Sequence, residues 1–588
     1  MVLNIVPQDN SLSPDLVCKR RQDTTAICIS AISYWLNNRY PSSSGIRNKR
    51  CCANIINFLC TQFLRIFAPM SRKKEKEIVR GVTVESVGAE GKAVARIDGK
   101  VVFMSNAVPG DVVAVRIDKR REKYFEGTLV EIEQPSPDRV EPFCEHYKDC
   151  GGCAWQELPY HLQLKYKQQQ VVDQFSRIGH LPMDQVEVQP ILPSERTTEY
   201  RNKLEFTFSD RRWLLSGEDP STVFDPPVPL DPSEFEGGVF PRHLRGGYSS
   251  VNGNPAGFAL GFHISKAFDK ILDIRHCWLQ PEPSNEIRNF IRQYAIVHGL
   301  PFFNIREQTG FLRNIIIRTN LRGEVMLTVM FGARPPKLGK LRCGFRPEDC
   351  DAEAEKLFDV LMERFPQIKS LNYLYNGRMN DAINDQEILN ARGEDAIYEE
   401  MEGLRFKIGP KSFYQTNPLQ AYRLYSTVRE FADFQGGEHV YDLYTGTGTI
   451  ALFVARSVAS VVGVEYVPEA IADAKVNARI NGIDNCRFYA GDMKDILTPE
   501  FVAAQGASPD VVILDPPRAG VHPSVIEVLL GTGARKIVYV SCNPATQARD
   551  LAMLTSGGAY RLVRIRPVDM FPHTTHVENV ALLEKVDC

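Results

Sequence analysis

The sequence lacks any apolar run long enough to cross a bilayer. The best candidate, residues 53–69, is short and interrupted by polar residues, whereas a spanning helix needs about 20 consecutive apolar residues. A secretory signal, which would place an apolar core directly after a basic start, is also missing at Met1. We therefore expect a soluble protein of the cytoplasm that has no membrane partner.

The sequence also has little net charge and no dense set of cysteines. Its 588 residues carry a formal net charge of −2, so any binding of nucleic acid must come from local basic patches. The 14 cysteines are unevenly spread and do not reach the density of a secreted disulfide scaffold, which indicates a reducing compartment. A chain of this length predicts about three domains.

Residues 1–70 show no sustained periodicity and do not match the segments that follow. They contain mixed polar runs and scattered cysteines, and Met70 is followed by Ser-Arg-Lys-Lys-Glu-Lys-Glu, which is typical of a bacterial start. We expect this segment to be either a disordered extension or the result of a start codon assigned too early.

Residues 71–135 predict a small β-barrel. Short apolar runs are separated by Gly-rich, Asp-Gly and Pro-Gly turns, at the spacing of a five-stranded barrel. The segment Lys119-Arg-Arg-Glu-Lys-Tyr-Phe125 is predicted to place basic and aromatic side chains in one loop. Barrels of this kind often bind oligonucleotides, although a run of charges can equally be a solvated face. The expected strands are residues 82–87, 92–97, 101–104, 111–117 and 127–132.

Three cysteines lie close together in the next segment, in the pattern Cys144-x5-Cys150-Gly-Gly-Cys153, and Cys277 is an isolated fourth candidate. Three thiols and a distant fourth can hold one metal centre. Structural zinc is the rival, but zinc sites usually combine two matched Cys-x2-Cys pairs, so this arrangement favours an iron–sulfur cluster. Buried thiols that bind nothing are the remaining interpretation.

Residues 136–403, which include these cysteines, predict a mixed α+β central domain. Residues 160–179 place apolar side chains at helical spacing. Further on, strand-like runs such as 314–319 alternate with helical ones such as 284–298. Residues 209–255 are rich in Gly, Pro and Ser, and we expect a long surface insertion there.

Residues 404–588 predict a doubly wound, Rossmann-like α/β domain. Strand, glycine loop and helix follow one another from residue 440, with Gly446 and Gly448 in the loop, and the next strand ends at Glu465. Glycines let the backbone approach a ligand, and that carboxylate is placed for ribose hydroxyls. The glycine pattern alone fits NAD as well as S-adenosylmethionine. Three carboxylates favour the methyl donor: Asp442, Asp492 and Asp515.

Cys542 follows an apolar run, residues 538–541, that predicts a buried parallel strand. Chemistry in open α/β sheets gathers at the carboxyl ends of such strands, although an arbitrary cysteine is more often a small buried hydrophobe. Here a second buried strand ends at Asp515, and Glu578 lies in a loop that enters a final apolar run. One thiol and two carboxylates at loop–strand junctions predict a covalent active site with its own acid or base.

Together these residues resemble the RNA uracil-5-methyltransferases, most closely the bacterial 23S rRNA branch that carries a TRAM barrel and a 4Fe-4S iron–sulfur cluster. The resemblance covers residues 71–588 apart from the insertion. It rests on motifs that occur in the family's order: Phe-Tyr-Gln415-Thr-Asn, Asp-Leu-Tyr444-x-Gly-x-Gly, Leu-Asp515-Pro-Pro-Arg-x-Gly, Ser-Cys542-Asn-Pro and His-Val-Glu578.

The resemblance implies that Cys542 is the nucleophile and Glu578 the base in methylation of uracil C5 in RNA. A thiolate that adds to C6 makes C5 nucleophilic enough to accept a methyl group, and a carboxylate then removes the C5 proton so that the thiolate can leave. The four cysteines would hold the cluster. Position 449 is Thr where relatives often have Asn. The residues implied for the cofactor and uracil pocket are Gln415, Tyr444, Thr449, Glu465, Asp492 and Asp515.

Other functions compete with this interpretation. A tRNA uracil-5-methyltransferase would share the catalytic domain, but relatives of that kind typically lack the barrel and the cysteines. A non-catalytic RNA-binding protein built on the barrel would bind no cofactor. An NAD-dependent oxidoreductase is suggested by the glycine loop alone. We expect 23S rRNA as the partner, and no obligate protein partner is evident.

Overall fold

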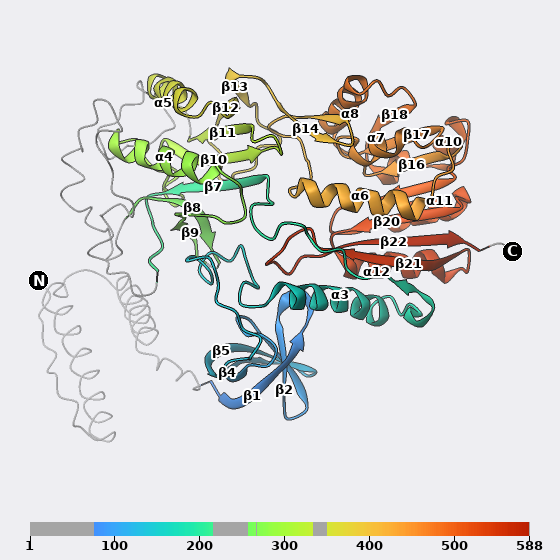
Figure 1. The fold of residues 1–588 in the computed structure, drawn as a ribbon, viewed down its shortest axis with the longest axis horizontal. Helices are drawn as coiled ribbons and strands as arrows, with labels where there is room; N and C mark the ends of the chain where they lie inside the picture. Colours follow the sequence, from blue (N-terminus) through green and yellow to red (C-terminus); the bar gives the residue numbers. More distant parts are fainter. Residues whose placement is uncertain (1–75, 216–256, 266, 333–349, 587–588) are drawn as a thin grey trace, which may run out of the picture. The chain divides into compact units, whose positions relative to one another are not determined.

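The computed structural model describes residues 76–215, 257–265, 267–332 and 350–586 (Figure 1). The chain divides between Lys76 and Glu77 into two units, and the elements below belong to the second. The predictions for residues 1–70 and for most of the insertion at 209–255 lie outside the described residues. Within the described part, no helix is long and apolar enough to cross a membrane.

The barrel consists of β1 (Ile78–Val87), β2 (Ala93–Ile97), β3 (Lys100–Met104), β4 (Val112–Arg120) and β5 (Tyr124–Gln134), with a 3-10 turn η1 (Ala89–Gly91) after β1. These strands close in the order β1-β2-β3-β5-β4, which confirms the predicted barrel. Buried, mostly β-branched side chains fill its interior. The predicted basic loop is wrong in detail, because Lys119 and Arg120 lie in β4 and Phe125 lies in β5.

The central sheet has seven strands in the order β13-β12-β11-β10-β7-β8-β9. All neighbours are antiparallel except β11 and β12. The two helices of this domain, α4 and α5, pack on the same face of the sheet. There the ring of Phe290 in α4 lies 5.5 Å, between centroids, from the ring of Phe365, which directly follows α5. The elements are β7 (Lys203–Ser209), β8 (Ala259–Ile264), β9 (Ala267–Asp273), α4 (Ser284–Val297), β10 (Leu312–Thr319), β11 (Val325–Phe331), α5 (Cys350–Arg364), β12 (Ile368–Tyr375) and β13 (Leu389–Gly393).

A hairpin of β14 (Ile397–Met401) and β15 (Leu404–Ile408) leads into the C-terminal α/β fold. Its sheet has the order β18-β17-β16-β19-β20-β22-β21-β6, and the strands from β18 to β20 are parallel. The elements are α6 (Pro418–Ala432), β16 (His439–Leu443), α7 (Thr449–Ala455), β17 (Ser460–Glu465), α8 (Pro468–Ile480), β18 (Cys486–Ala490), α9 (Met493–Ile496), α10 (Pro499–Ala504), β19 (Val511–Leu514), α11 (Pro523–Thr532), β20 (Lys536–Ser541), α12 (Pro544–Ser556), β21 (Tyr560–Val568) and β22 (Glu578–Lys585).

Two elements of this fold come from much earlier in the chain. The edge strand β6 (Glu187–Val188), preceded by a 3-10 turn η2 (Met183–Gln185), pairs with β21 in parallel. Helix α3 (Tyr160–Arg177) lies beside α12 (Figure 1) and shares an apolar core with it, with α11 and with one face of the sheet. Helices α6, α7 and α8 cover the other face. The sheet is therefore buried on both sides, as its continuous apolar strands require.

Candidate active site

Three reactive side chains lie together at one end of the sheet, where the parallel strands finish. Asp515 follows β19 and Cys542 follows β20, and these neighbouring strands are parallel, so both residues leave the sheet at the same end. Strand β22 runs antiparallel to β20, with Ser541 opposite Asn579. Glu578, the first residue of β22, therefore lies at that end too. The structure brings together the thiol and the two carboxylates that the sequence singled out.

Burial and neighbouring negative charges raise the pKa of all three groups. Burial raises the pKa of Glu578 to about 8, and the charge of Asp515 adds to the rise. The pKa of Asp515 is raised to about 7, first by burial and then by the charge of Asp442. The Cys542 thiol lies beside both carboxylates, and burial followed by their charges raises its pKa to about 11. The thiol and Glu578 are therefore mostly protonated at neutral pH in the free protein.

Arg518 opposes these shifts, although no role was predicted for it from the sequence. Its guanidinium charge acts on both Cys542 and Glu578 and works against the rise in the pKa of each. Its loop is fixed to the start of α12, because Asn543 Nδ2 and the Thr546 hydroxyl each donate to the Arg518 carbonyl (3.1 Å). The available signal was its position in Asp-Pro-Pro-Arg, directly after a predicted strand end.

The glycine loop between β16 and α7 is built around Asp442. The buried Asp442 Oδ2 accepts hydrogen bonds from the Thr445 hydroxyl and from the Ala451 N–H (3.0 Å). Tyr444 and Gly446 adopt left-handed backbone conformations, with φ of 67° and 58°. A Cβ added to Gly446 would meet nothing within 4 Å, so the loop leaves open space beside its backbone for a ligand.

Two carboxylates border this loop. Glu465 Oε2 accepts the Gly446 N–H (3.1 Å) and Oε1 accepts the Val467 N–H (3.0 Å), which fixes the carboxylate at the end of β17. Asp492 caps α9 and pairs with Lys494 (3.1 Å), and its hydrogen bonds to Lys494 lower the pKa of Asp492. Glu465 is thus held by the loop itself, whereas Asp492 is held at a helix start.

The remaining predicted cofactor residues differ in their surroundings. Thr449 is the first residue of α7 and is buried, with its hydroxyl 3.3 Å from that of Thr447. Gln415 is half-buried just before α6, and its carbonyl accepts a hydrogen bond from Asn202 Nδ2 (3.2 Å). The Gln415 backbone is therefore tied to the segment that precedes β7.

The four cysteines predicted to share a metal centre line one cavity of about 500 Å³: Cys144, Cys150, Cys153 and Cys277. Burial raises the pKa of all four thiols, to about 12 for Cys150 and Cys153. Among the residues that the structure describes, no group of three or more His, Cys, Asp or Glu could hold a metal ion. The thiols thus face a common space without forming a compact site for a single ion.

This cavity reaches the catalytic loops. Its lining includes Arg518, together with Phe571, Thr574 and His576 from the loop that leads into Glu578. Nothing in the chain order predicts this proximity, because strands β10 to β13 of the central sheet and much of the C-terminal fold lie between Cys277 and the catalytic motifs. Thiols and catalytic groups are neighbours only in the folded protein.

Two regions of the chain match known families. Residues 380–586 match the family described as tRNA (Uracil-5-)-methyltransferase, and residues 74–130 match the TRAM domain. An uncharacterized RNA methyltransferase of Porphyromonas gingivalis is 52% identical over 502 residues, which cover 85% of this chain and 98% of that protein. One of Bacteroides thetaiotaomicron is 51% identical over 499 residues, 85% of this chain and 100% of that protein.

A solved structure supports the same family. The crystal structure of Pyrococcus abyssi tRNA (uracil-54, C5)-methyltransferase in complex with S-adenosyl-L-homocysteine is 25% identical in sequence, with a TM-score of 0.59, and the match covers 86% of this chain and 100% of that one. The predicted α/β fold with an N-terminal TRAM barrel is confirmed. The chain belongs to the S-adenosylmethionine-dependent RNA uracil-5-methyltransferase family.

Proposed function

We propose that this protein methylates C5 of a uridine in 23S rRNA through a covalent adduct between Cys542 and C6 of the uracil. The observation that carries the mechanism is that Cys542 and Glu578 lie together at one end of the sheet. Strand β16 enters the glycine loop at the same end. A cytoplasmic location follows from the proposed substrate.

The residues around the glycine loop fit S-adenosylmethionine. Open space beside Gly446 and the carboxylate of Glu465 at the next strand end suit a nucleoside, and Tyr444, Asp492 and Gln415 complete the proposed cofactor-binding set. When bound, this cofactor supplies an electrophilic methyl group. Thr449 belongs to the same set, and its hydroxyl lies 3.3 Å from that of Thr447.

The chain's own groups carry the remaining steps. The Cys542 thiolate forms a bond to C6, and the π electrons of C5=C6 move toward C5, which becomes the nucleophile for methylation. Glu578 in its ionised form, which the charge of Arg518 favours, then accepts the C5 proton, the C–H electrons restore C5=C6, and the C6–S bond breaks to release the thiolate. Arg518 favours the thiolate, and so does the N-terminus of α12, which follows Cys542 directly. Asp515 completes the uracil side of the pocket.

We propose that the four cysteines hold a 4Fe-4S cluster. The support is the donor set, because four thiols line one cavity and thiolates are the ligands of such clusters. A zinc ion with Zn–S bonds of about 2.3 Å would need a compact tetrahedron, and the described residues contain no such group. A cluster there would join the segment around Cys144 to Cys277.

The choice of 23S rRNA rests on the resemblance of the sequence, with its barrel and four cysteines, to the rRNA branch of the family. A tRNA substrate is the second candidate, because the similar Pyrococcus abyssi protein acts on tRNA. Transcripts of 23S rRNA and of tRNA, incubated separately with the protein and labelled methyl donor, would distinguish the two. Exclusive methylation of tRNA would contradict our choice, and equal methylation would remove its support.

The mechanism is tested with two substitutions and one control. Cys542→Ala should give neither methylation nor an adduct, since no group remains to attack C6. Glu578→Gln should methylate C5 but retain the proton, and should accumulate a protein–RNA species that survives denaturing gels and carries the labelled methyl group. Cys486→Ala, at another partly buried thiol of the same fold, should behave as wild type. An adduct in Cys542→Ala, or wild-type turnover in Glu578→Gln, would contradict the assigned roles.

A further inference from the structure

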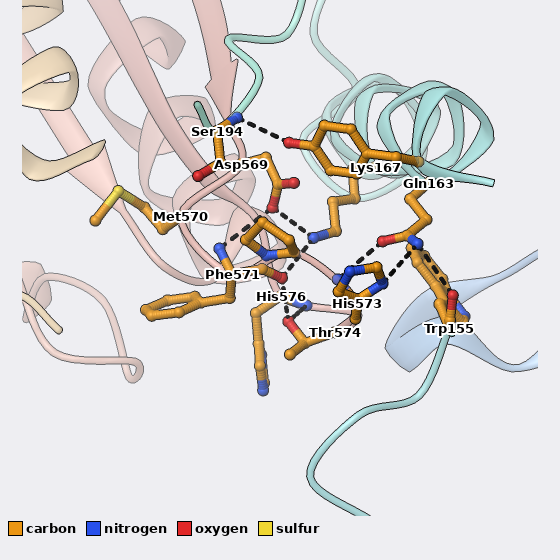
Figure 2. A network of polar contacts seen from close by, with 12 residues as sticks. Trp155, Gln163, Lys167, Ser194, Asp569, Met570, Phe571, His573, Thr574 and His576 are labelled. Atoms are coloured by element: carbon orange, nitrogen blue, oxygen red, sulfur yellow. Dashed lines mark hydrogen bonds and ion pairs between the residues drawn. The ribbon is translucent and has the colours of Figure 1, made fainter. Parts of the chain in front are cut away.

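Helix α3 buries two polar side chains on the face that packs against the C-terminal fold. Gln163, Lys167, Val171 and Phe175 are spaced four residues apart and all are buried. The first two point at the loop between β21 and β22, residues 569–577 (Figure 2). Half of this buried stripe is therefore polar, and both polar side chains have partners in this loop, although Gln163 Nε2 also donates to the Trp155 and Leu158 carbonyls.

Lys167 and Asp569 form an ion pair in which both side chains are fully buried. Lys167 Nζ lies 2.6 Å from Asp569 Oδ1 and also donates to the Phe571 carbonyl (2.9 Å). The same Asp569 oxygen accepts the Phe571 N–H (3.2 Å). One ammonium group thus fixes the first residue of the loop and a peptide two residues further on.

Gln163 holds the loop at His573. Its amide NH₂ donates to His573 Nδ1 (3.1 Å), and its carbonyl accepts the His573 N–H (2.8 Å). The His573 carbonyl accepts the N–H groups of Ala154 and Trp155 (2.8 and 3.0 Å), directly after Cys153. His573 has a φ of 64°, a left-handed conformation that persists in a non-glycine residue only where the surroundings fix it.

Stability alone does not account for the buried ion pair. Taking two charges out of water is costly, and a well-packed apolar pair is often at least as stable. The ammonium group must hydrogen-bond a carboxylate and a carbonyl at the same time, and few conformations of the loop allow both bonds. An apolar side chain could pack against several loop conformations. The pair therefore specifies one conformation of residues 569–573.

The loop held in this way ends at Glu578. Strands β21 and β22 are antiparallel, with Val568 opposite Glu578. The loop therefore leaves and re-enters the sheet at the end where Cys542 and Asp515 lie. Lys167 anchors its start and Gln163 its middle. The short remainder, 574–577, then runs directly to Glu578.

We propose that Lys167 and Gln163 are positioning residues that orient the Glu578 carboxylate for removal of the C5 proton. Neither acts on the substrate; both act through the loop. The proposal rests on the proposed function, in which Glu578 is the base. It assigns to a helix far from the catalytic motifs in sequence a specific effect on one step, the resolution of the adduct.

The test is the double variant Lys167→Met/Asp569→Asn, which removes both charges and keeps a side-chain oxygen for the Phe571 N–H. Adduct formation and decay are followed in single turnovers with 23S rRNA fragments and labelled methyl donor, and S-adenosylhomocysteine binding is measured by calorimetry. We expect near-unchanged cofactor binding and adduct formation, but release of methylated RNA slowed about 30-fold or more, as misplacement of a catalytic group by about 1 Å can cause. The labelled adduct should therefore accumulate.

Two further variants accompany this one. Gln163→Met removes both hydrogen bonds to His573 without changing the charge, and should slow release of methylated RNA in the same way. If the double variant does not fold, this variant alone tests the proposal. Arg177→Met, on the exposed last turn of α3, breaks a surface pair with Asp173 and should leave every step unchanged.

Each outcome has a fixed meaning. Wild-type release in folded Lys167→Met/Asp569→Asn and Gln163→Met would overturn the proposal. Equal slowing of adduct formation and release, or weakened cofactor binding, would also overturn it, because it would indicate a general structural role. Glu578→Gln is run in parallel, and if that variant releases product at the wild-type rate, the failure lies in the proposed function instead.

Discussion

Replacing Glu578 by Gln should stabilise the protein at alkaline pH. The Glu578 side chain is only 5% exposed, and burial followed by the charge of Asp515 raises its pKa from 4.5 to about 8. Between these values the native state keeps the proton that the unfolded chain has lost, so stability falls as pH rises through this window. At about 1.4 kcal/mol for each tenfold change in proton affinity, the loss reaches at most about 5 kcal/mol above pH 8.

Gln has nearly the same shape and does not titrate, so the variant escapes this loss. Thermal unfolding of wild type and Glu578→Gln is compared from pH 4.5 to 9 without cofactor. Because a chain of this size does not unfold in one step, the transition of the C-terminal fold is the quantity to compare. The two should coincide near pH 4.5 and diverge to about 10 °C in favour of the variant at pH 9, since about 1 kcal/mol shifts the Tm of a domain of this size by about 2–4 °C.

The control is Glu527→Gln, which removes an exposed carboxylate on α11. That variant should follow the wild type across the whole pH range. If the curves of wild type and Glu578→Gln run parallel from pH 4.5 to 9, then Glu578 is not held protonated by its surroundings, and the electrostatic account of the catalytic edge is wrong.

Four other substitutions test three separate parts of the molecule. Asp442→Ala leaves the buried Ala451 N–H without its acceptor, which should cost about 1–3 kcal/mol and weaken S-adenosylhomocysteine binding measured by calorimetry. Cys277→Ser should reduce the iron content of anaerobically purified, brown protein from about four atoms per chain to well below that, and stoichiometric zinc without iron in the wild type would contradict the cluster. Lys119→Gln should weaken RNA binding and reduce its salt dependence by about one phosphate contact; because Lys119 pairs with Glu126 at 2.7 Å, Glu126→Gln should strengthen binding instead.

The parts of the fold that depend on local pattern were predictable from the sequence. The barrel followed from short apolar runs with turn residues between them, and the glycine loop from its position between a buried strand and a helix. Cys542 and Asp515 could be placed together because neighbouring parallel strands end at the same edge. The position of Glu578 required the antiparallel direction of β22, which no local pattern reveals.

What the sequence could not show depends on partners distant in the chain. Helical periodicity correctly predicted α3, but it counts apolar residues, so Gln163 and Lys167 were assigned to no role although they share the buried stripe. Their partners, His573 and Asp569, lie about 400 residues away. Likewise, the basic segment at Lys119 read as a loop because charge runs usually indicate loops, whereas in the barrel it extends a strand.

The pairing of β6 with β21 bears on whether the catalytic fold can be separated from the rest of the chain. A fragment of residues 404–588 would begin after β6 and α3, so the backbone groups of β21 along this edge would lose their partner. The apolar surface of α12 that α3 covers would also face water. An unpaired strand edge next to bare apolar surface is a template for association with a second copy. Such a fragment should therefore aggregate, whereas excision of the central sheet with β6 and α3 retained would leave the edge protected.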